Sequence, residues 1–166
     1  GAPTPVVAFM AGAAELAGVA VLVRVFLLAL PGLPVDWGLL FWVLAVLTMT
    51  VGNVTALRQR NVKRMLAYSS IAHAGYALVG LVTASKTGGG ALLFYLAVYA
   101  FMNLGAFGVV IALGRRGAPN EDLADFAGVG FRHPVLGLSM TVFMLSLAGI
   151  PPTAGFAGKF YLFSAA

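Results

Sequence analysis

Long apolar runs separated by short polar segments constrain the fold of this chain more than any other feature. Five such runs cover about residues 6–30, 38–57, 65–84, 91–113 and 134–166. A helix needs about 20 apolar residues to cross the hydrocarbon core of a bilayer, and each run reaches that length. Strands of a membrane barrel would instead alternate apolar and polar side chains over about ten residues. The sequence therefore predicts an all-α, polytopic transmembrane bundle of about five helices.

Composition favours a bilayer over water as the surroundings of the chain. Hydrophobic residues make up 61% of its 166 positions and charged residues 9%, which is too little charge to cover a soluble domain. The net charge of +5 would suit nucleic acid, but most basic side chains lie in two short connections, as membrane proteins place them. We therefore expect a lipid partner and no nucleic acid. There is no cysteine, and two distant histidines offer no metal site.

Lys and Arg also predict which side of the membrane each connection faces. Seven of them fall at residues 58–64 and 114–133, whereas Lys86 alone lies in a connection on the other side. Cytoplasmic connections carry the excess of positive charge, so we expect these two, and the N-terminus of the chain, in the cytoplasm of a bacterial inner-membrane protein. We also expect residues 1–166 to be part of one membrane domain, with both ends cut from a longer protein.

The connections carry two local predictions. Gly88–Gly90 are expected to separate the third helix from the fourth, because glycine is a poor helix former. Within the long polar connection, residues 122–126 (DLADF) predict a short helix at the membrane interface.

Four ionisable side chains lie inside the apolar runs: Glu15, Arg24, His73 and Lys159. A charge at mid-bilayer costs roughly 2.5–3.5 kcal/mol on insertion scales, so such residues usually face a bundle interior and serve a function. For Arg24 we favour a structural role, because its stem reaches toward the interface. Glu15, near mid-helix, fits equally a neutral carboxyl bonded to a neighbouring helix and a carboxyl that relays protons.

His73 has polar neighbours on its own helix. Ser69 and Ser70 precede it by four and three positions and Tyr76 follows by three, which places them on one face. Histidine changes charge near neutral pH, so this group suits a proton pathway, although a packed histidine that joins two helices has the same pattern. A second polar face on the next helix is predicted by the four-residue spacing of Tyr95, Tyr99 and Asn103.

Lys159 follows a predicted interruption of the last helix. Pro151 and Pro152 remove two backbone donors, while Gly149 and Gly155 loosen the helix on both sides. Broken helices at membrane depth mark ion sites in transporters, so a lysine four residues beyond Gly155 is well placed to use the opening. A simple kink in a structural helix is the alternative.

Two segments resemble signatures of the antiporter-like subunits of respiratory complex I. They are residues 60–76, RNVKRMLAYSSIAHAGY, and residues 146–160, SLAGIPPTAGFAGKF. Residues 1–6 are similar to the usual entry into the preceding helix, and the histidine and residues 95–107 are most similar to the N-type paralogues. The resemblance implies a subunit of two inverted five-helix repeats, of which this chain is mostly the second. It also implies other membrane-arm subunits as partners, with quinone reduction elsewhere driving proton pumping.

The resemblance assigns roles to individual residues. His73 resembles the central histidine of a hydrophilic axis, and Lys159 resembles the terminal lysine on the broken helix. Family members usually carry a lysine where this chain has Glu15. Either the carboxyl keeps the relay, or pumping through this path is altered or lost. The lysine of the preceding broken helix is expected before Gly1.

The expected function is that of a proton-translocating subunit of NADH:quinone oxidoreductase. We expect no catalytic redox residue and no cofactor on this chain, since the sequence carries no nucleotide, flavin, iron–sulfur or haem signature. Within transport, the alternative is a subunit of a multisubunit cation/proton antiporter or of a membrane-bound hydrogenase, which share these motifs. A non-conducting scaffold subunit of the membrane arm is the alternative outside transport.

Overall fold

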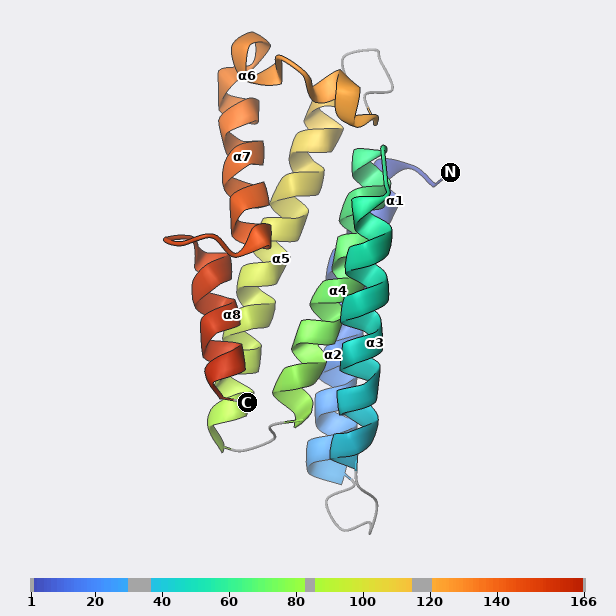
Figure 1. Ribbon diagram of the computed structural model, residues 1–166, viewed down its shortest axis with the longest axis vertical. Coiled ribbons are helices and arrows are strands. Elements are labelled where there is room, and N and C mark those ends of the chain that lie inside the picture. The colour runs from blue at the N-terminus through green and yellow to red at the C-terminus, as the bar shows by residue number, and fades with distance from the viewer. Residues whose placement is uncertain (1, 30–36, 83–85, 115–120, 166) are drawn as a thin grey trace.

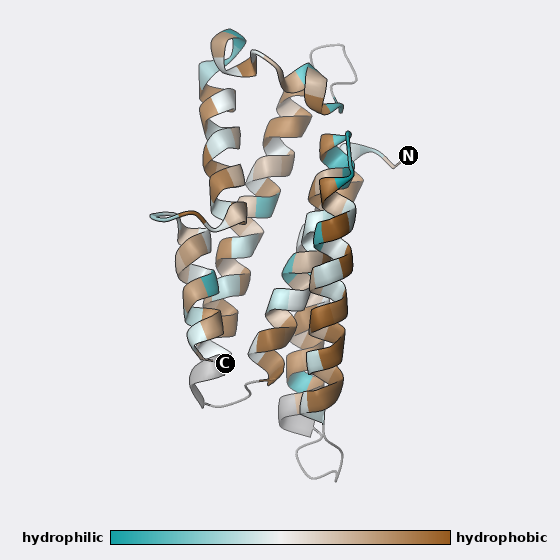
Figure 2. Ribbon diagram, in the orientation of Figure 1, coloured by the Kyte–Doolittle hydropathy of each residue, from teal (hydrophilic) through white to brown (hydrophobic). Residues whose placement is uncertain are grey.

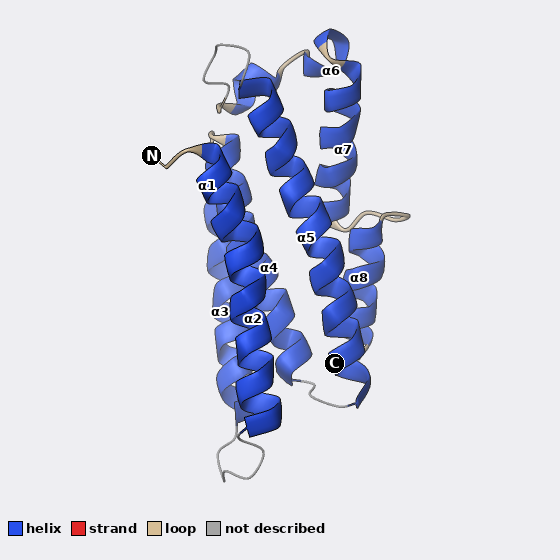
Figure 3. Cartoon of the chain, turned by 180° about the vertical axis from the view of Figure 1, so that it is seen from behind, coloured by secondary structure: helices blue, strands red, loops and turns tan. Residues whose placement is uncertain are grey.

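The computed structural model describes residues 2–29, 37–82, 86–114 and 121–165. Within these ranges every regular element is a helix, apart from one isolated bridge between Asn61 and Asp122 (Figure 3). Four of the helical spans are long and apolar enough to cross a membrane, and they cover residues 4–26, 37–57, 62–82 and 89–114. The predicted all-α transmembrane bundle is confirmed.

The first span changes its helical winding twice. It consists of α1 (Thr4–Phe9), a π-helical segment (Met10–Ala14), α2 (Glu15–Val23) and a second π-helical segment (Arg24–Ala29). A proline in its first turn removes a backbone N–H that would have no partner there. Single π turns inside helices are rare and gather at functional sites, and the first of them directly precedes Glu15.

Three uninterrupted helices follow: α3 (Trp37–Leu57), α4 (Val62–Val82) and α5 (Lys86–Gly114). The prediction that Gly88–Gly90 separate two helices is wrong, because α5 includes them. Glycine lowers helix propensity, but a helix is the conformation that satisfies backbone groups internally where a chain enters lipid. The boundary between α4 and α5 falls at residues 83–85, outside the described residues.

The last span is broken, as the sequence predicts. It divides into α7 (Pro134–Ala148) and α8 (Ala154–Ser164), of 15 and 11 residues, and the break lies about midway along the molecule (Figure 1). Gly149 ends α7 with a left-handed backbone, φ 82°, which glycine adopts without steric cost. Thr153 then caps α8, since its hydroxyl accepts from the Phe156 N–H at 3.4 Å.

The helices form two groups that meet along α4 and α5. Helices α1 to α4 lie on one side, and α5, α7 and α8 on the other, with α5 beside both halves of the broken span (Figures 1 and 3). Hydrophobic colour covers most of each span, while isolated hydrophilic turns appear halfway along several helices (Figure 2). Large apolar side chains on α3, such as Leu47 and Val51, are exposed, as lipid-facing side chains are.

The start of α1, the connection at residues 58–61 and residues 121–133 lie at one end of the bundle, in keeping with the prediction that they share a side (Figure 1). The Val62 N–H donates to the Glu121 carbonyl at 2.6 Å, and Lys63 pairs with the Glu121 carboxylate at 2.6 Å. The predicted short helix in the second connection is a single 3-10 turn, Leu123–Phe126, held by a capping box between Asp122 and Asp125. A four-residue helix, α6 (Val129–Arg132), then leads into α7.

Candidate functional site

In the π-helical segment of the first span, the Ala11 carbonyl accepts hydrogen bonds from side chains of α5. The Glu15 N–H bonds to the Gly12 carbonyl rather than to that of Ala11. The Ala11 carbonyl instead accepts the Asn103 side-chain amide at 2.7 Å and the Tyr99 hydroxyl at 3.1 Å. Asn103 therefore ties two helices together, and the same contact brings Glu15 beside Tyr99.

Glu15 and Tyr99 form a pair that accommodates both protonation states of the carboxyl. The Tyr99 oxygen lies 3.2 Å from Glu15 Oε2 and 3.1 Å from the Ala11 carbonyl, yet a phenol has a single hydrogen to donate. When Glu15 is charged, Tyr99 donates to it. When Glu15 is protonated, it donates to the Tyr99 oxygen, and Tyr99 donates to Ala11. Glu15 can therefore gain or lose a proton while both it and Tyr99 keep a hydrogen-bonding partner.

His73 lies at the centre of the bundle, with only 3% of its surface exposed. Its Nδ1 is 2.5 Å from the Tyr95 hydroxyl. Its ring stacks on Tyr99, with centroids 4.8 Å apart and planes at 20°, and meets the edge of Tyr76 at 5.3 Å. The histidine thus contacts three tyrosines, and one of them, Tyr99, also bonds Glu15.

The two serines predicted to share a face with His73 have different surroundings. Ser70 is buried toward the first span, within hydrogen-bonding reach of both Glu15 and Tyr99, and it donates to the Ala67 carbonyl at 2.8 Å. Ser69 lines a cavity together with His73 and Tyr76. Spacings of three and four residues place both serines near the His73 face of the helix.

Lys159 closes the end of α7 across the break. Its Nζ donates to the Leu147 carbonyl at 2.7 Å and to the Ala148 carbonyl at 3.4 Å. The last carbonyls of a helix lack intrahelical partners and carry partial negative charge, so an ammonium group there satisfies both needs. Nζ also lies 5.0 Å from the centre of the Tyr76 ring, a cation–π distance.

Glycines on both sides of the break let its two halves approach. A Cβ on Gly149 would lie 3.1 Å from Lys159 Cδ, and a Cβ on Gly155 would overlap the Ser146 carbonyl oxygen. The Gly155 N–H donates to Ser146 Oγ at 3.0 Å, which joins the start of α8 to the last turn of α7. Pro151 and Pro152 form the linking turn. Of the four residues predicted to form the break, Gly149, Pro151 and Pro152 lie between α7 and α8, whereas Gly155 lies in the first turn of α8.

A cavity of about 560 Å³ joins His73 to Lys159. Its polar lining also includes Ser69, Tyr76 and Asn53, and it extends to Gln59 and Leu123 at the end of the bundle that carries the basic connections. Since liquid water occupies about 30 Å³ per molecule, the space between the two titratable groups is large enough for several waters.

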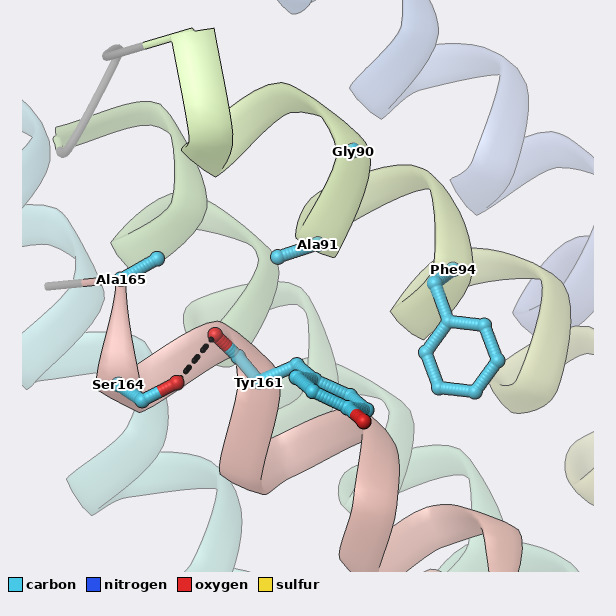
Figure 4. A pocket seen from close by; sticks show the side chains of 6 residues that line it. All are labelled: Gly90, Ala91, Phe94, Tyr161, Ser164 and Ala165. Carbon is cyan, nitrogen blue, oxygen red and sulfur yellow. Dashed lines mark hydrogen bonds between the residues drawn. The ribbon is translucent and has the colours of Figure 1, made fainter.

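A second cavity, of about 490 Å³, lies between the start of α5 and the end of α8 (Figure 4). Its lining is small or aromatic and comprises Gly90, Ala91, Phe94, Tyr161, Ser164 and Ala165. The Ser164 hydroxyl is bound to the Tyr161 carbonyl at 3.1 Å. Because none of these six described residues is a carboxylate, histidine or lysine, this cavity is not the candidate site.

Tyr95 and Asn53 also belong to the site, although the sequence linked neither of them to His73 or Tyr76. The four-residue spacing did place Tyr95 on a polar face, but only the fold shows that its hydroxyl meets His73. Asn53, isolated in sequence, donates to the Tyr76 hydroxyl at 3.2 Å. Arg24 is exposed, in keeping with a structural role. Within the described ranges, no three His, Cys, Asp or Glu side chains gather at metal-binding distance.

Comparison with known proteins gives consistent matches over the whole chain. Residues 1–166 match a family model described as NADH:quinone oxidoreductase/Mrp antiporter, TM. NADH-quinone oxidoreductase subunit N of Trichlorobacter lovleyi is 60% identical over 100% of this chain and 34% of its own length. Subunit N 2 of Sorangium cellulosum is 55% identical over 99% of this chain and 34% of its own length.

A solved structure of respiratory complex I from Thermus thermophilus with bound aureothin contains a similar chain. That chain has a TM-score of 0.80 and 40% identity, over 100% of this chain and 35% of its own length. The present chain thus spans about a third of the length of its relatives. With every residue matched, and with relatives named as subunit N, the chain belongs to the NADH:quinone oxidoreductase/Mrp antiporter transmembrane family, in agreement with its two signature segments.

Proposed function

We propose that this chain is part of a proton-translocating, non-redox subunit of an NADH:quinone oxidoreductase. Glu15, His73 and Lys159 carry the protons. The observation that carries this proposal is the continuous run of polar and aromatic side chains between these three residues, which lie on α2, α4 and α8. Burial of ionisable groups in a membrane bundle is costly, and they persist where they serve a pathway.

The contacts bring the groups of each transfer close together, with hydroxyls beside both Glu15 and His73. Between Glu15 and His73, the Tyr99 hydroxyl bonds the carboxyl while the Tyr99 ring stacks on the imidazole, and Ser70 adds a second hydroxyl. Between His73 and Lys159, the cavity of about 560 Å³ gives room for a chain of water molecules. Hydroxyls and water relay protons by exchanging hydrogen bonds, so no group needs to travel far.

The partners are the other membrane-arm subunits of the oxidoreductase, and the membrane is a bacterial inner membrane. The N-terminus and the connections at 58–64 and 114–133 face the cytoplasm in this proposal, because Lys and Arg concentrate there. Relatives named as subunits of NADH-quinone oxidoreductase favour this complex over a multisubunit antiporter. Affinity purification of the full-length subunit from its own membranes tests the choice. Recovery of antiporter subunits without an NADH-oxidising arm would contradict it.

Glu15 keeps the relay, in our proposal, although the resemblance described above implies a lysine at this position. The contact between Glu15 and Tyr99 supports this proposal. Whether the carboxyl is charged or protonated, every donor and acceptor of the pair keeps a hydrogen-bonding partner. A carboxyl held only for structure would need only one of these two hydrogen-bonding arrangements.

The test compares Glu15→Gln and Glu15→Lys in the full-length subunit, within the whole complex in membrane vesicles. NADH-driven proton uptake is measured together with NADH oxidation by a hydrophilic acceptor, which reports an assembled complex. The Gln variant is expected to take up protons well below both wild type and the Lys variant, because an amide cannot accept and release a proton. Glu121→Gln, which changes a carboxyl outside the spans, is the matched control. If vesicles carrying Glu15→Gln take up protons as fast as wild type, Glu15 is not in the relay.

A further inference from the structure

Tyr95 is a fully buried phenol whose hydroxyl is committed to His73. Among the described residues, that hydroxyl has one hydrogen-bonding partner, His73 Nδ1, at 2.5 Å. A buried hydroxyl needs an acceptor for its single hydrogen. The contact therefore makes Tyr95 the donor and Nδ1 the acceptor.

This donor assignment fixes the tautomer of the neutral imidazole. An imidazole whose Nδ1 accepts a hydrogen bond carries its own proton on Nε2. A proton arriving at His73 must then add to Nδ1, where Tyr95 lies. The Tyr95 hydroxyl has to turn its hydrogen away at that moment and accept instead.

Two contacts hold the ring of Tyr95 in place, so its hydroxyl oxygen stays beside His73 while the hydrogen is free to turn. The ring stacks beside Tyr99, with centroids 6.4 Å apart and planes at 13°. On the other side it packs against Gly158, where an added Cβ would lie 3.3 Å from Tyr95 Cδ2. Gly158 directly precedes Lys159 on α8, so Tyr95 is wedged between the imidazole and the half-helix that carries the lysine.

We propose that Tyr95 is a positioning residue that holds His73 in its Nε2–H tautomer and controls proton access to Nδ1. This inference rests on the proposed proton-translocating function and names a residue through which His73 is tuned. The titratable groups that act on His73 come from four helices: Tyr76 on α4, Tyr99 on α5, Lys159 on α8, and Glu15 on α2 by way of Tyr99. The residues that α3 and α7 contribute to the cavity beside His73, Asn53, Ala56 and Leu57 on α3 and Met144, Leu147 and Ala148 on α7, do not titrate.

The primary test is Tyr95→Phe in the full-length subunit of the complete complex. Phenylalanine keeps the ring against Gly158 and removes only the hydroxyl. Tyr161→Phe is the matched control, because Tyr161 is exposed on α8. We expect proton uptake to fall about two- to tenfold in Tyr95→Phe, the effect of losing one hydrogen bond, with a displaced pH profile. Uptake and a pH profile equal to those of Tyr161→Phe would overturn the proposal.

A second variant decides the matter if Tyr95→Phe does not assemble. Replacing Tyr95 by 3-fluorotyrosine keeps the ring and the hydroxyl but makes the hydroxyl more acidic. A residue that only fills space leaves the pH profile of proton uptake unchanged, whereas the proposed donor to Nδ1 shifts it. The same replacement at Tyr161 is expected to have no effect. An unshifted profile in the Tyr95 protein would overturn the proposal.

His73→Ala separates failure of this inference from failure of the proposed function. If His73→Ala keeps full proton uptake, the proposed pathway through His73 is wrong. If His73→Ala loses uptake while both Tyr95 variants behave as their controls, the pathway stands and only the role of Tyr95 is wrong.

Discussion

Gly155→Ala is expected to weaken the packing of the start of α8 against the last turn of α7. A Cβ at this position would overlap the Ser146 carbonyl oxygen and lie 2.8 Å from Met102 Sδ. Overpacking of a tight contact costs about 1–3 kcal/mol. Any shift that relieves the clash also lengthens the hydrogen bond from the Gly155 N–H to Ser146 Oγ, which is 3.0 Å long. Loss of that hydrogen bond costs about 0.5–1.5 kcal/mol. We therefore expect α8 to be destabilised locally by roughly 2–4 kcal/mol.

Hydrogen–deuterium exchange of the peptide covering residues 154–164, in the solubilised complex, measures this local stability. A loss of about 2 kcal/mol speeds exchange roughly 30-fold when exchange is limited by the opening equilibrium. Gly108→Ala is the matched control, because a Cβ there meets nothing within 4 Å. Exchange in Gly155→Ala within about threefold of the control would refute the close packing of the two half-helices.

Two further predictions concern the flanks of the site. Tyr76→Phe should keep proton uptake closer to wild type than Tyr76→Leu does, because phenylalanine retains the ring 5.0 Å from Lys159 Nζ; equal losses in vesicle assays would contradict the cation–π contact. At the end of the bundle, the hydrogen bond from Lys63 lowers the pKa of Glu121. Its stabilisation is therefore full at neutral pH and lost as pH falls through that lowered pKa. A spin label on Ala124→Cys should gain mobility in acid, and Glu121→Gln should remove that transition.

The helices were predictable because apolar runs of membrane length leave the chain few alternatives. The break was predictable too, since Pro151 and Pro152 cannot continue the hydrogen-bonding pattern of a helix. The predicted helix boundary at Gly88–Gly90 was wrong because glycine, unlike proline, weakens a helix without preventing one. Helix α5 runs through all three residues. The change to π winding before Glu15 has no sequence rule of comparable strength.

The sequence predicted which residues belong to the candidate site better than it predicted which of them touch. Buried charge singles out His73 and Lys159 from sequence, because lipid penalises such residues wherever they lie. Periodicity assigns a side chain to a helix face but not to a partner on another helix. For that reason the bond between Asn53 and Tyr76 was not foreseen.

The most direct test of a proton pathway through the bundle is the number of protons translocated per NADH oxidised, measured in proteoliposomes of the complete complex with His73→Ala in the full-length subunit. His73 links the Glu15–Tyr99 pair to the cavity that reaches Lys159. The pathway predicts a lower proton-to-NADH ratio than wild type, with the complex assembled and NADH oxidation by a hydrophilic acceptor intact. An unchanged ratio in that variant would contradict it.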